Sequence, residues 1–245
     1  MKRLILALVV IFLTSLIVHL PLGFVAQYIP TIPGLSLTQA SGTLWHGRFH
    51  SVAWNKQQLG SLSWQFRPSS LLLGKLDLDF TLKGQSHLSA KGNAGLSFSG
   101  VYLQDVQLDL ASAAIDNFID FPLPISTVGA ISFTIADYQA SSPWCTNLAG
   151  NGQWRNAGLS LPIGQVNVGE VKATLSCQAG SIVVKSTSSS TELATELSIS
   201  FSPQNRYKID GYLTATENLP QAIRSQLAWL GTPDQQGRYK LTFSG

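Results

Sequence analysis

Charged residues are scarce in this chain of 245 residues. Asp, Glu, Lys and Arg together account for 12% of it, which is about half of their usual share in globular proteins. Helices with a solvated face need many charged side chains, so this composition disfavours a mainly helical fold. The net charge is only +3 and the basic residues form no cluster, so we expect no nucleic acid partner.

The sequence also lacks the strings that identify common catalytic sites. It contains no G-x-S-x-G, P-loop or H-E-x-x-H string, which argues against an exposed nucleophile, a phosphate-binding loop and a zinc-binding helix. A single G-x-G occurs at Gly150 and Gly152, without the third glycine or the helix that a dinucleotide site requires.

Two pairs of ionisable residues have a spacing that invites a functional interpretation. His46 and His50 are four residues apart, but the surrounding pattern is extended, and on a strand they would lie about 13 Å from each other. Asp116 and Asp120 are spaced as neighbours on an exposed helix face, with no partner base in evidence. We therefore expect no enzymatic activity, no metal site and no cofactor.

One long apolar run is present, from Leu4 to Leu20, and no charged residue interrupts it. Continued as a helix to about Tyr28, this segment would measure about 37 Å, which exceeds the ~30 Å hydrocarbon core of a bilayer. We expect residues 1–28 to form a short cytoplasmic stub and a transmembrane anchor.

A cleaved signal peptide is the alternative interpretation, because it also begins with basic residues followed by an apolar run. Near Ala26, however, Phe24 stands where a small side chain is expected before the cleavage site. The sequence favours an anchor that is retained. Lys2 and Arg3 would keep the amino terminus in the cytoplasm, so residues 29–245 are expected to form a periplasmic domain of a single-pass protein in the cell inner membrane.

Cysteine is nearly absent, since Cys145 and Cys177 are the only two. In an oxidising compartment we expect them to form one disulfide. It would close a loop of about 33 residues and stabilise the fold by roughly 3 to 4 kcal/mol through chain entropy. No histidine lies within this loop to complete a metal site.

Alternation of apolar and polar residues dominates the chain after the apolar run. In residues 75–83, KLDLDFTLK, every even position is apolar and every odd position is polar, as in a half-buried strand. The same alternation recurs around Trp64, Leu108, Phe133 and Ile199. We therefore expect a mainly β fold, with a curved, largely antiparallel meander sheet after the transmembrane helix. Whether the apolar face is packed or open is not determined by the pattern.

Only a few short helices are expected, at residues 69–73, 115–119 and 219–230. Asn218 could cap the last of them and Gly231 could end it. Pro122 and Pro124 mark a break near residues 120–128 that could divide the β domain into two halves. The serine-rich residues 186–190 are expected at an exposed hairpin tip.

Several tryptophans lie close to glycines, and packing explains them, because glycine permits close approach of a backbone or ring.

The order of the tryptophan- and glycine-containing segments resembles that of the type II secretion system protein N (GspN) family. The likeness begins with SGTLWHG at residues 41–47, continues through 59–68, 71–74 and the Cys145 region with Gly150 and Gly152, and closes at 227–231 and 237–239. The residues that carry it are Gly42, Trp45, Gly47, Trp64, Gly150, Gly152, Gly231 and Gly237.

The resemblance implies an accessory inner-membrane component of the machine that exports folded proteins from the periplasm across the outer membrane. Its partners would be other inner-membrane or periplasmic subunits of that system, and the family supplies no catalytic residue. The SGTLW-x-G segment also resembles the opening of AsmA-like envelope proteins, whose curved sheets are associated with lipid handling. A periplasmic lipid-binding or lipid-transfer module is therefore the alternative. The two hypotheses differ in whether the apolar sheet face is packed dry or lines a groove.

Overall fold

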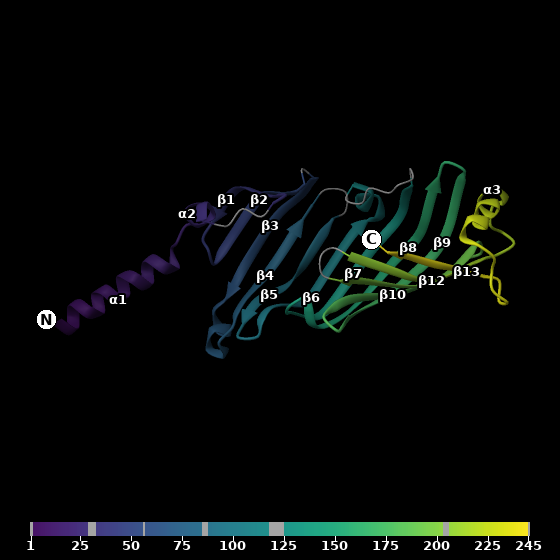
Figure 1. Ribbon diagram of the computed structural model, residues 1–245. Coiled ribbons are helices and arrows are strands. Elements are labelled where there is room, and N and C mark those ends of the chain that lie inside the picture. The colour runs from purple at the N-terminus through teal and green to yellow at the C-terminus, as the bar shows by residue number, and fades with distance from the viewer. Residues whose placement is uncertain are drawn as a thin grey trace.

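The computed structural model describes residues 2–28, 33–55, 57–84, 88–117, 125–202 and 206–244. Within this part of the chain, thirteen strands form one antiparallel sheet in the order β1 to β13 (Figure 1). Each strand pairs with its neighbours in the sequence, so the expected meander is confirmed. Because the order is linear, β1 and β13 are the two edges of the sheet.

The strands lengthen toward the middle of the chain, where β7, β8 and β9 have 15, 17 and 15 residues. Their bounds are β1 Leu35–Gly42, β2 His46–Trp54, β3 Gln57–Arg67, β4 Leu76–Lys83, β5 Ser89–Ser97, β6 Gly100–Ala111, β7 Ser126–Ala140, β8 Cys145–Leu161, β9 Gly164–Gln178, β10 Ser181–Ser189, β11 Leu193–Ser202, β12 Arg206–Ala215 and β13 Arg238–Ser244.

The helices are few and mostly short: α1 Lys2–Val18, α2 Leu22–Val25, η1 Ala26–Tyr28, η2 Pro68–Leu73, η3 Ser112–Asn117, α3 Gln221–Arg224 and η4 Ser225–Leu230. The three short helical segments expected from the sequence correspond to η2, η3 and the pair α3 and η4. The expected cap is wrong, because the Asn218 side chain donates to the carbonyl of Thr191 (3.2 Å) and Pro220 occupies the N-cap position. Gly231 ends η4 with a φ of 100°.

The amino-terminal helix is shorter than expected. α1 ends at Val18, and Pro21 forms an isolated antiparallel bridge with Thr43 at the turn between β1 and β2. A proline disfavours helical conformation in the residue before it, which explains the break. Across the described residues, none of the helices combines the length and the apolar character needed to cross a membrane.

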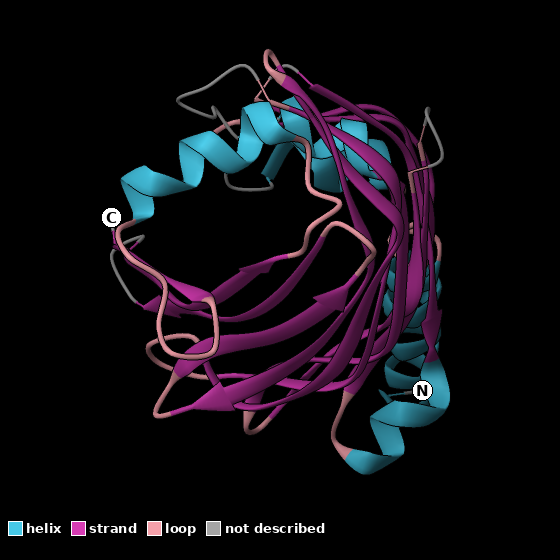
Figure 2. Ribbon diagram, turned by 90° about the vertical axis from the view of Figure 1, so that its right-hand side faces the viewer, coloured by secondary structure: helices cyan, strands magenta, loops and turns pink. Residues whose placement is uncertain are grey.

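Alternate residues of the strands point to one side of the sheet, which we call the inner face. Trp64 is paired with Phe80, and Phe80 with Gly92. Directly paired residues project from the same side, so their side chains are neighbours. Figure 2 shows that the sheet curls around one side, with the C-terminal helices at the near end of the curl. The apolar positions of successive strands thus form one continuous inner face.

β-bulges contribute to the curvature. The pairing of β5 with β6 shifts beside Asp105, and that of β8 with β9 shifts beside Asn156. Both residues have a φ of 51°, in the left-handed region that Asp and Asn tolerate better than most residues. A bulge increases the local twist and bends the strand. The sheet therefore curls at positions where the alternation changes phase.

Two clusters of buried side chains cover the ends of the inner face. Near the amino terminus, Leu22 packs with Phe49 and Val52. Near the carboxyl terminus, the segment that contains α3 and η4 packs on β8, β9 and β11. Its buried members are Ala157, Val166, Val168, Leu193, Leu219, Ile223 and Leu227. Segments from the two ends of the chain thus supply the cover that the sheet itself lacks.

Two expectations fall near the middle of the chain. The region 120–128 lies mostly outside the described residues, and the flanking strands β6 and β7 pair directly within the one sheet. The expected hairpin tip at residues 186–190 is wrong for most of its length. Ser186 and Ser188 are buried in β10, where the Ser188 hydroxyl is hydrogen-bonded to that of Thr195 (2.7 Å). This bond satisfies a polar group on the inner face.

Candidate functional site

The middle of the inner face is a candidate binding surface. Its side chains are apolar and partly exposed, whereas the ends of the face are covered. The middle is formed by Phe66, Leu78, Phe80, Leu82, Ala90, Leu103, Leu108 and Phe133. Partly exposed apolar side chains gain free energy when a ligand or partner removes them from water, by roughly 25 cal/mol per Å². This surface can therefore bind an apolar ligand.

Glycines keep this face smooth in β8. Gly152 is buried and paired with Phe133, and a Cβ at Gly152 would lie 2.8 Å from the Phe133 ring. A Cβ at Gly150 would lie 2.9 Å from the carbonyl oxygen of Thr134. Any larger residue would have to displace the neighbouring strand or ring. These two motif glycines therefore permit close packing between β7 and β8, and the structure places no nucleotide-binding helix after them.

A second feature is the joint between α1 and the sheet. Trp64 lies over Gly47, where a Cβ would come within 2.4 Å of the indole ring. The indole Nε1 donates to the carbonyl of Leu44 (2.9 Å), and the ring contacts Phe49 at 5.4 Å between centroids. Trp64 thus holds the turn between β1 and β2 against β3. We call these residues, together with Leu22, the joint.

The other motif residues of this region complete the same turn. Gly42 has a φ of 87°, and a Cβ there would lie 2.3 Å from the carbonyl oxygen of His46. Trp45 packs on Phe66, with ring centroids 4.9 Å apart. The amide of Leu44 donates to the carbonyl of Leu20 (3.1 Å). The structure therefore brings Gly42, Trp45, Gly47 and Trp64 together at the point where the apolar segment joins the sheet.

The remaining predicted residues lie elsewhere. Gly231 and Gly237 flank the loop between η4 and β13, each with a positive φ and with open space around its α-carbon. They serve the turns that bring β13 back to β12. Cys145 and Cys177 form a disulfide that joins β8 to β9, with 6.1 Å between their α-carbons. Both cysteines lie at strand ends at the same end of the sheet, and several strands separate them from the joint.

Of the two ionisable pairs, His46 and His50 both line a hollow of about 450 Å³, together with Arg48 and Asp79. The His50 ring is hydrogen-bonded to the carbonyl of Gln39 (2.9 Å). Asp120 and the side chain of Asp116 lie outside what the structure describes. Among the described residues, no group of three side chains is placed to hold a metal ion.

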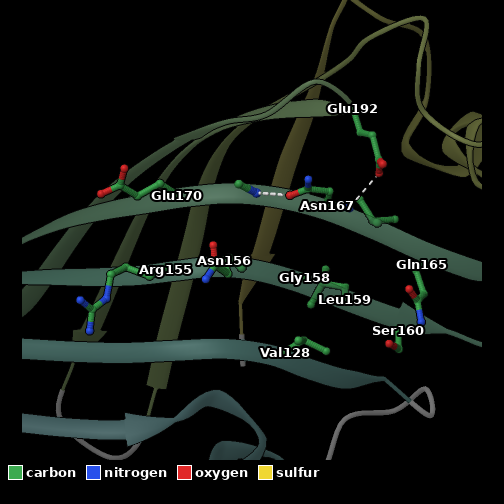
Figure 3. A pocket seen from close by; sticks show the side chains of 13 residues that line it. Val128, Arg155, Asn156, Gly158, Leu159, Ser160, Gln165, Asn167, Glu170 and Glu192 are labelled. Atoms are coloured by element: carbon green, nitrogen blue, oxygen red, sulfur yellow. Dashed lines mark hydrogen bonds between the residues drawn. The ribbon is translucent and has the colours of Figure 1, made fainter.

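The outer face carries a hollow of about 720 Å³ that the sequence did not indicate (Figure 3). It lies where bulges interrupt the pairing of β7, β8 and β9. Arg155, Asn156, Glu170 and Glu192 line it, and Glu192 accepts a hydrogen bond from the amide of Asn167 (2.7 Å). The hollow is open and its walls mix both charges. It lies beside these bulges, and alternation does not show where bulges fall.

The model of the family "Type II secretion system (T2SS), protein N" matches residues 33–242. A protein of Vibrio cholerae serotype O1 named type II secretion system protein N is 32% identical over 237 residues, which cover 96% of this chain and 94% of that protein. A protein of the same name from Aeromonas hydrophila is 28% identical over 239 residues, with the same coverage. No solved structure gave a significant match.

Proposed function

Because the chain belongs to the type II secretion system protein N family, we propose that it is an accessory component of that system, anchored in the inner membrane. Residues 1–28 hold the anchor, with the amino terminus in the cytoplasm, and residues 29–245 form a periplasmic domain. The domain assists the export of folded proteins by binding other subunits of the secretion system.

The exposed side chains of α1 support the anchor. Leu8, Ile11 and Phe12 are exposed by 60%, 66% and 66%, and the helix begins with Lys2 and Arg3. Burial of a large apolar side chain is favourable by about 1.5–3 kcal/mol, and in water these exposed side chains do not gain this free energy. In a bilayer the lipid tails cover them. The basic residues at the start of the helix suit the cytoplasmic side.

The periplasmic domain is suited to binding because of its surfaces. The edge strands β1 and β13 each have one side without a partner strand in the sheet. Such an edge can accept a strand of another protein through backbone hydrogen bonds. The partly exposed inner face is the observation that carries the proposal, because it offers apolar area for a partner across several strands.

Deletion of residues 29–245 in a bacterium that uses this secretion system is expected to leave secreted enzymes in the periplasm. The reason is that the anchor alone lacks the sheet that binds other subunits. The measurement is the fraction of secreted enzyme activity in the medium, with a resident periplasmic enzyme as the control for leakage. The proposal fails if cells without the domain secrete as much as cells with it.

The partly exposed middle of the inner face also favours the second candidate, an AsmA-like module that binds or transfers lipid. Such a module needs an apolar surface that acyl chains can reach. Leu78 and Phe80 are partly exposed, and they lie between the two covered ends of the sheet. This candidate predicts that the purified chain carries phospholipid.

Phe80→Asp is expected to remove co-purifying phospholipid while the thermal midpoint falls little. A charge on a partly exposed surface costs about 1 kcal/mol or less, whereas a charge in a dry core costs several. Mass spectrometry of extracted lipid and a thermal scan measure the two effects. Thr81→Asp, on the next residue and the outer face, is the matched control. A wild-type chain without lipid, or a Phe80→Asp chain that does not fold, would count against the lipid-binding candidate.

A further inference from the structure

Every second turn of a meander lies at the same end of the sheet. The turns β1–β2, β3–β4, β5–β6, β7–β8 and β9–β10 therefore share one end, which we call the anchor-side rim. The apolar segment joins the sheet at this end. Pro21 forms an isolated antiparallel bridge with Thr43, and the amide of Leu44 donates a hydrogen bond to the carbonyl of Leu20. In Figure 1 the helix α1 extends away from the sheet from beside α2 and β1, and η2 appears as a short blue coil below β3 and β4.

The rim exposes large apolar side chains at its tips. Leu72 and Leu73 in η2 are exposed by 90% and 75%, and Phe98 in the β5–β6 turn is exposed by 98%. The two tips are adjacent, since a Cβ at Gly74 would lie 2.8 Å from the Phe98 ring. Exposed side chains of this size in neighbouring turns form a patch, and such patches on folded proteins mark contact surfaces.

The apolar character continues along the rim toward the C-terminal strands. Trp144 in the β7–β8 turn is 37% exposed, and Phe201 and Tyr207 are each 43% exposed. These three residues line a mostly apolar hollow of about 350 Å³ together with Ile182, Ser202 and Arg206. All six lie at strand ends or turns of the same rim. The rim therefore carries exposed apolar side chains both near β3 to β6 and near β7 to β12.

Charge differs between the two ends of the sheet. The described rim turns, residues 43–45, 68–75, 98–99, 141–144 and 179–180, contain no acidic residue, and Lys75 lies among them. Connections at the opposite end contain Glu192, Glu217 and Asp234 together with Arg224, and Asp234 forms an ion pair with Arg238 (2.8 Å). Hydrogen bonds from the backbone of Arg238 keep the pKa of Asp234 below its ordinary value, so this carboxyl stays charged. The described rim turns therefore carry no negative charge that would oppose contact with an anionic lipid surface.

We propose that the anchor-side rim rests in the periplasmic leaflet of the inner membrane, with Leu72, Leu73 and Phe98 inserted among the lipids. This inference rests on the proposed function, because it takes α1 to be the membrane anchor. Leucine and phenylalanine side chains at the tips suit the acyl boundary, and tryptophan and tyrosine suit the headgroup level. With the rim at the membrane, the strands stand away from it and the inner face begins at the lipid surface.

Photocross-linking of the full chain tests the proposal. A benzophenone amino acid is placed at Leu72, at Phe98 or at Ile163, and each chain is reconstituted in vesicles of phosphatidylethanolamine and phosphatidylglycerol. Ile163 is the matched control, since it is 47% exposed in the β8–β9 turn at the opposite end. We expect lipid adducts from the probes at Leu72 and Phe98 and no lipid adduct from the probe at Ile163. Equal adducts at all three positions would overturn the proposal, as would none at Leu72 and Phe98.

A fourth probe at Leu8 separates this inference from the proposed anchor. Lipid adducts at Leu8 without any at Leu72 and Phe98 would keep the anchor and reject the rim contact. If none of the probes at Leu8, Leu72 and Phe98 forms a lipid adduct, both the anchor and the rim contact are rejected. The same probes in intact cells address a protein partner. If Leu72 and Phe98 link to another protein in place of lipid there, the rim is a protein-binding surface and the proposal is wrong.

Discussion

Replacing Leu22 with alanine is expected to lower the free energy of unfolding by about 2–5 kcal/mol. Leu22 is 1% exposed and packs with Phe49 and Val52 in the joint. Removal of its side chain deletes apolar contacts and leaves a cavity that the paired strands β1 to β3 cannot easily fill. Chemical denaturation of the full chain in detergent, followed by tryptophan fluorescence, measures the loss, since Trp64 reports on this cluster.

Leu72→Ala is the matched control, because the same change at a side chain exposed by 90% should alter stability in detergent by no more than about 0.5 kcal/mol. Equal stabilities for the two variants would mean that α2 does not dock on the sheet. The arrangement of the joint would then be wrong, and α1 would be connected to the domain only by a flexible link.

Loss of the disulfide is the second large effect. Replacing both Cys145 and Cys177 with serine is expected to destabilise the domain by roughly 3 to 4 kcal/mol, because the bond closes a long loop and limits the unfolded chain. The two cysteines are 32 residues apart in the sequence and join β8 to β9. Cys145 is 2% exposed, so the serine hydroxyl at that position also has to be buried.

The measurement is the denaturation midpoint with and without reductant. The wild-type chain should lose stability when reductant is present, and the double serine variant should not respond to reductant. Alkylation of both thiols in the native protein without prior reduction would show that the bond does not form. If the fully reduced wild-type chain has the same denaturation midpoint as the oxidised chain, the disulfide contributes little to stability.

Much of the architecture could be predicted because it follows from short-range pattern. Leu78 and Phe80 alternate with polar residues, and in a strand alternate side chains point to the same side. Ile223 and Leu227 recur at helical spacing, and both are buried where the C-terminal helices pack on the sheet. In each case the information lies within a few neighbouring residues.

Other features were missed or misplaced because the pattern was ambiguous. The serine-rich segment suggested an exposed turn, yet Ser188 is buried and hydrogen-bonded to Thr195 across the strands. The apolar run suggested one long helix, yet the chain breaks before Pro21 and docks Leu22 on the sheet. The residue types of a segment do not determine whether its side chains are buried, because burial depends on which other segments the fold packs against them.

The sequence by itself determined the strands, their meander order, the pair of cysteines and the family, because alternation, turn residues and motif order are local or linear properties. Only the tertiary structure decided which apolar residues are covered. Leu22 and Leu72 are both leucines in apolar segments near the same end of the sheet, but one is 1% exposed and the other 90%. Their exposure differs because contacts between segments distant in the sequence, and the bulges that curve the sheet, set what lies over each side chain.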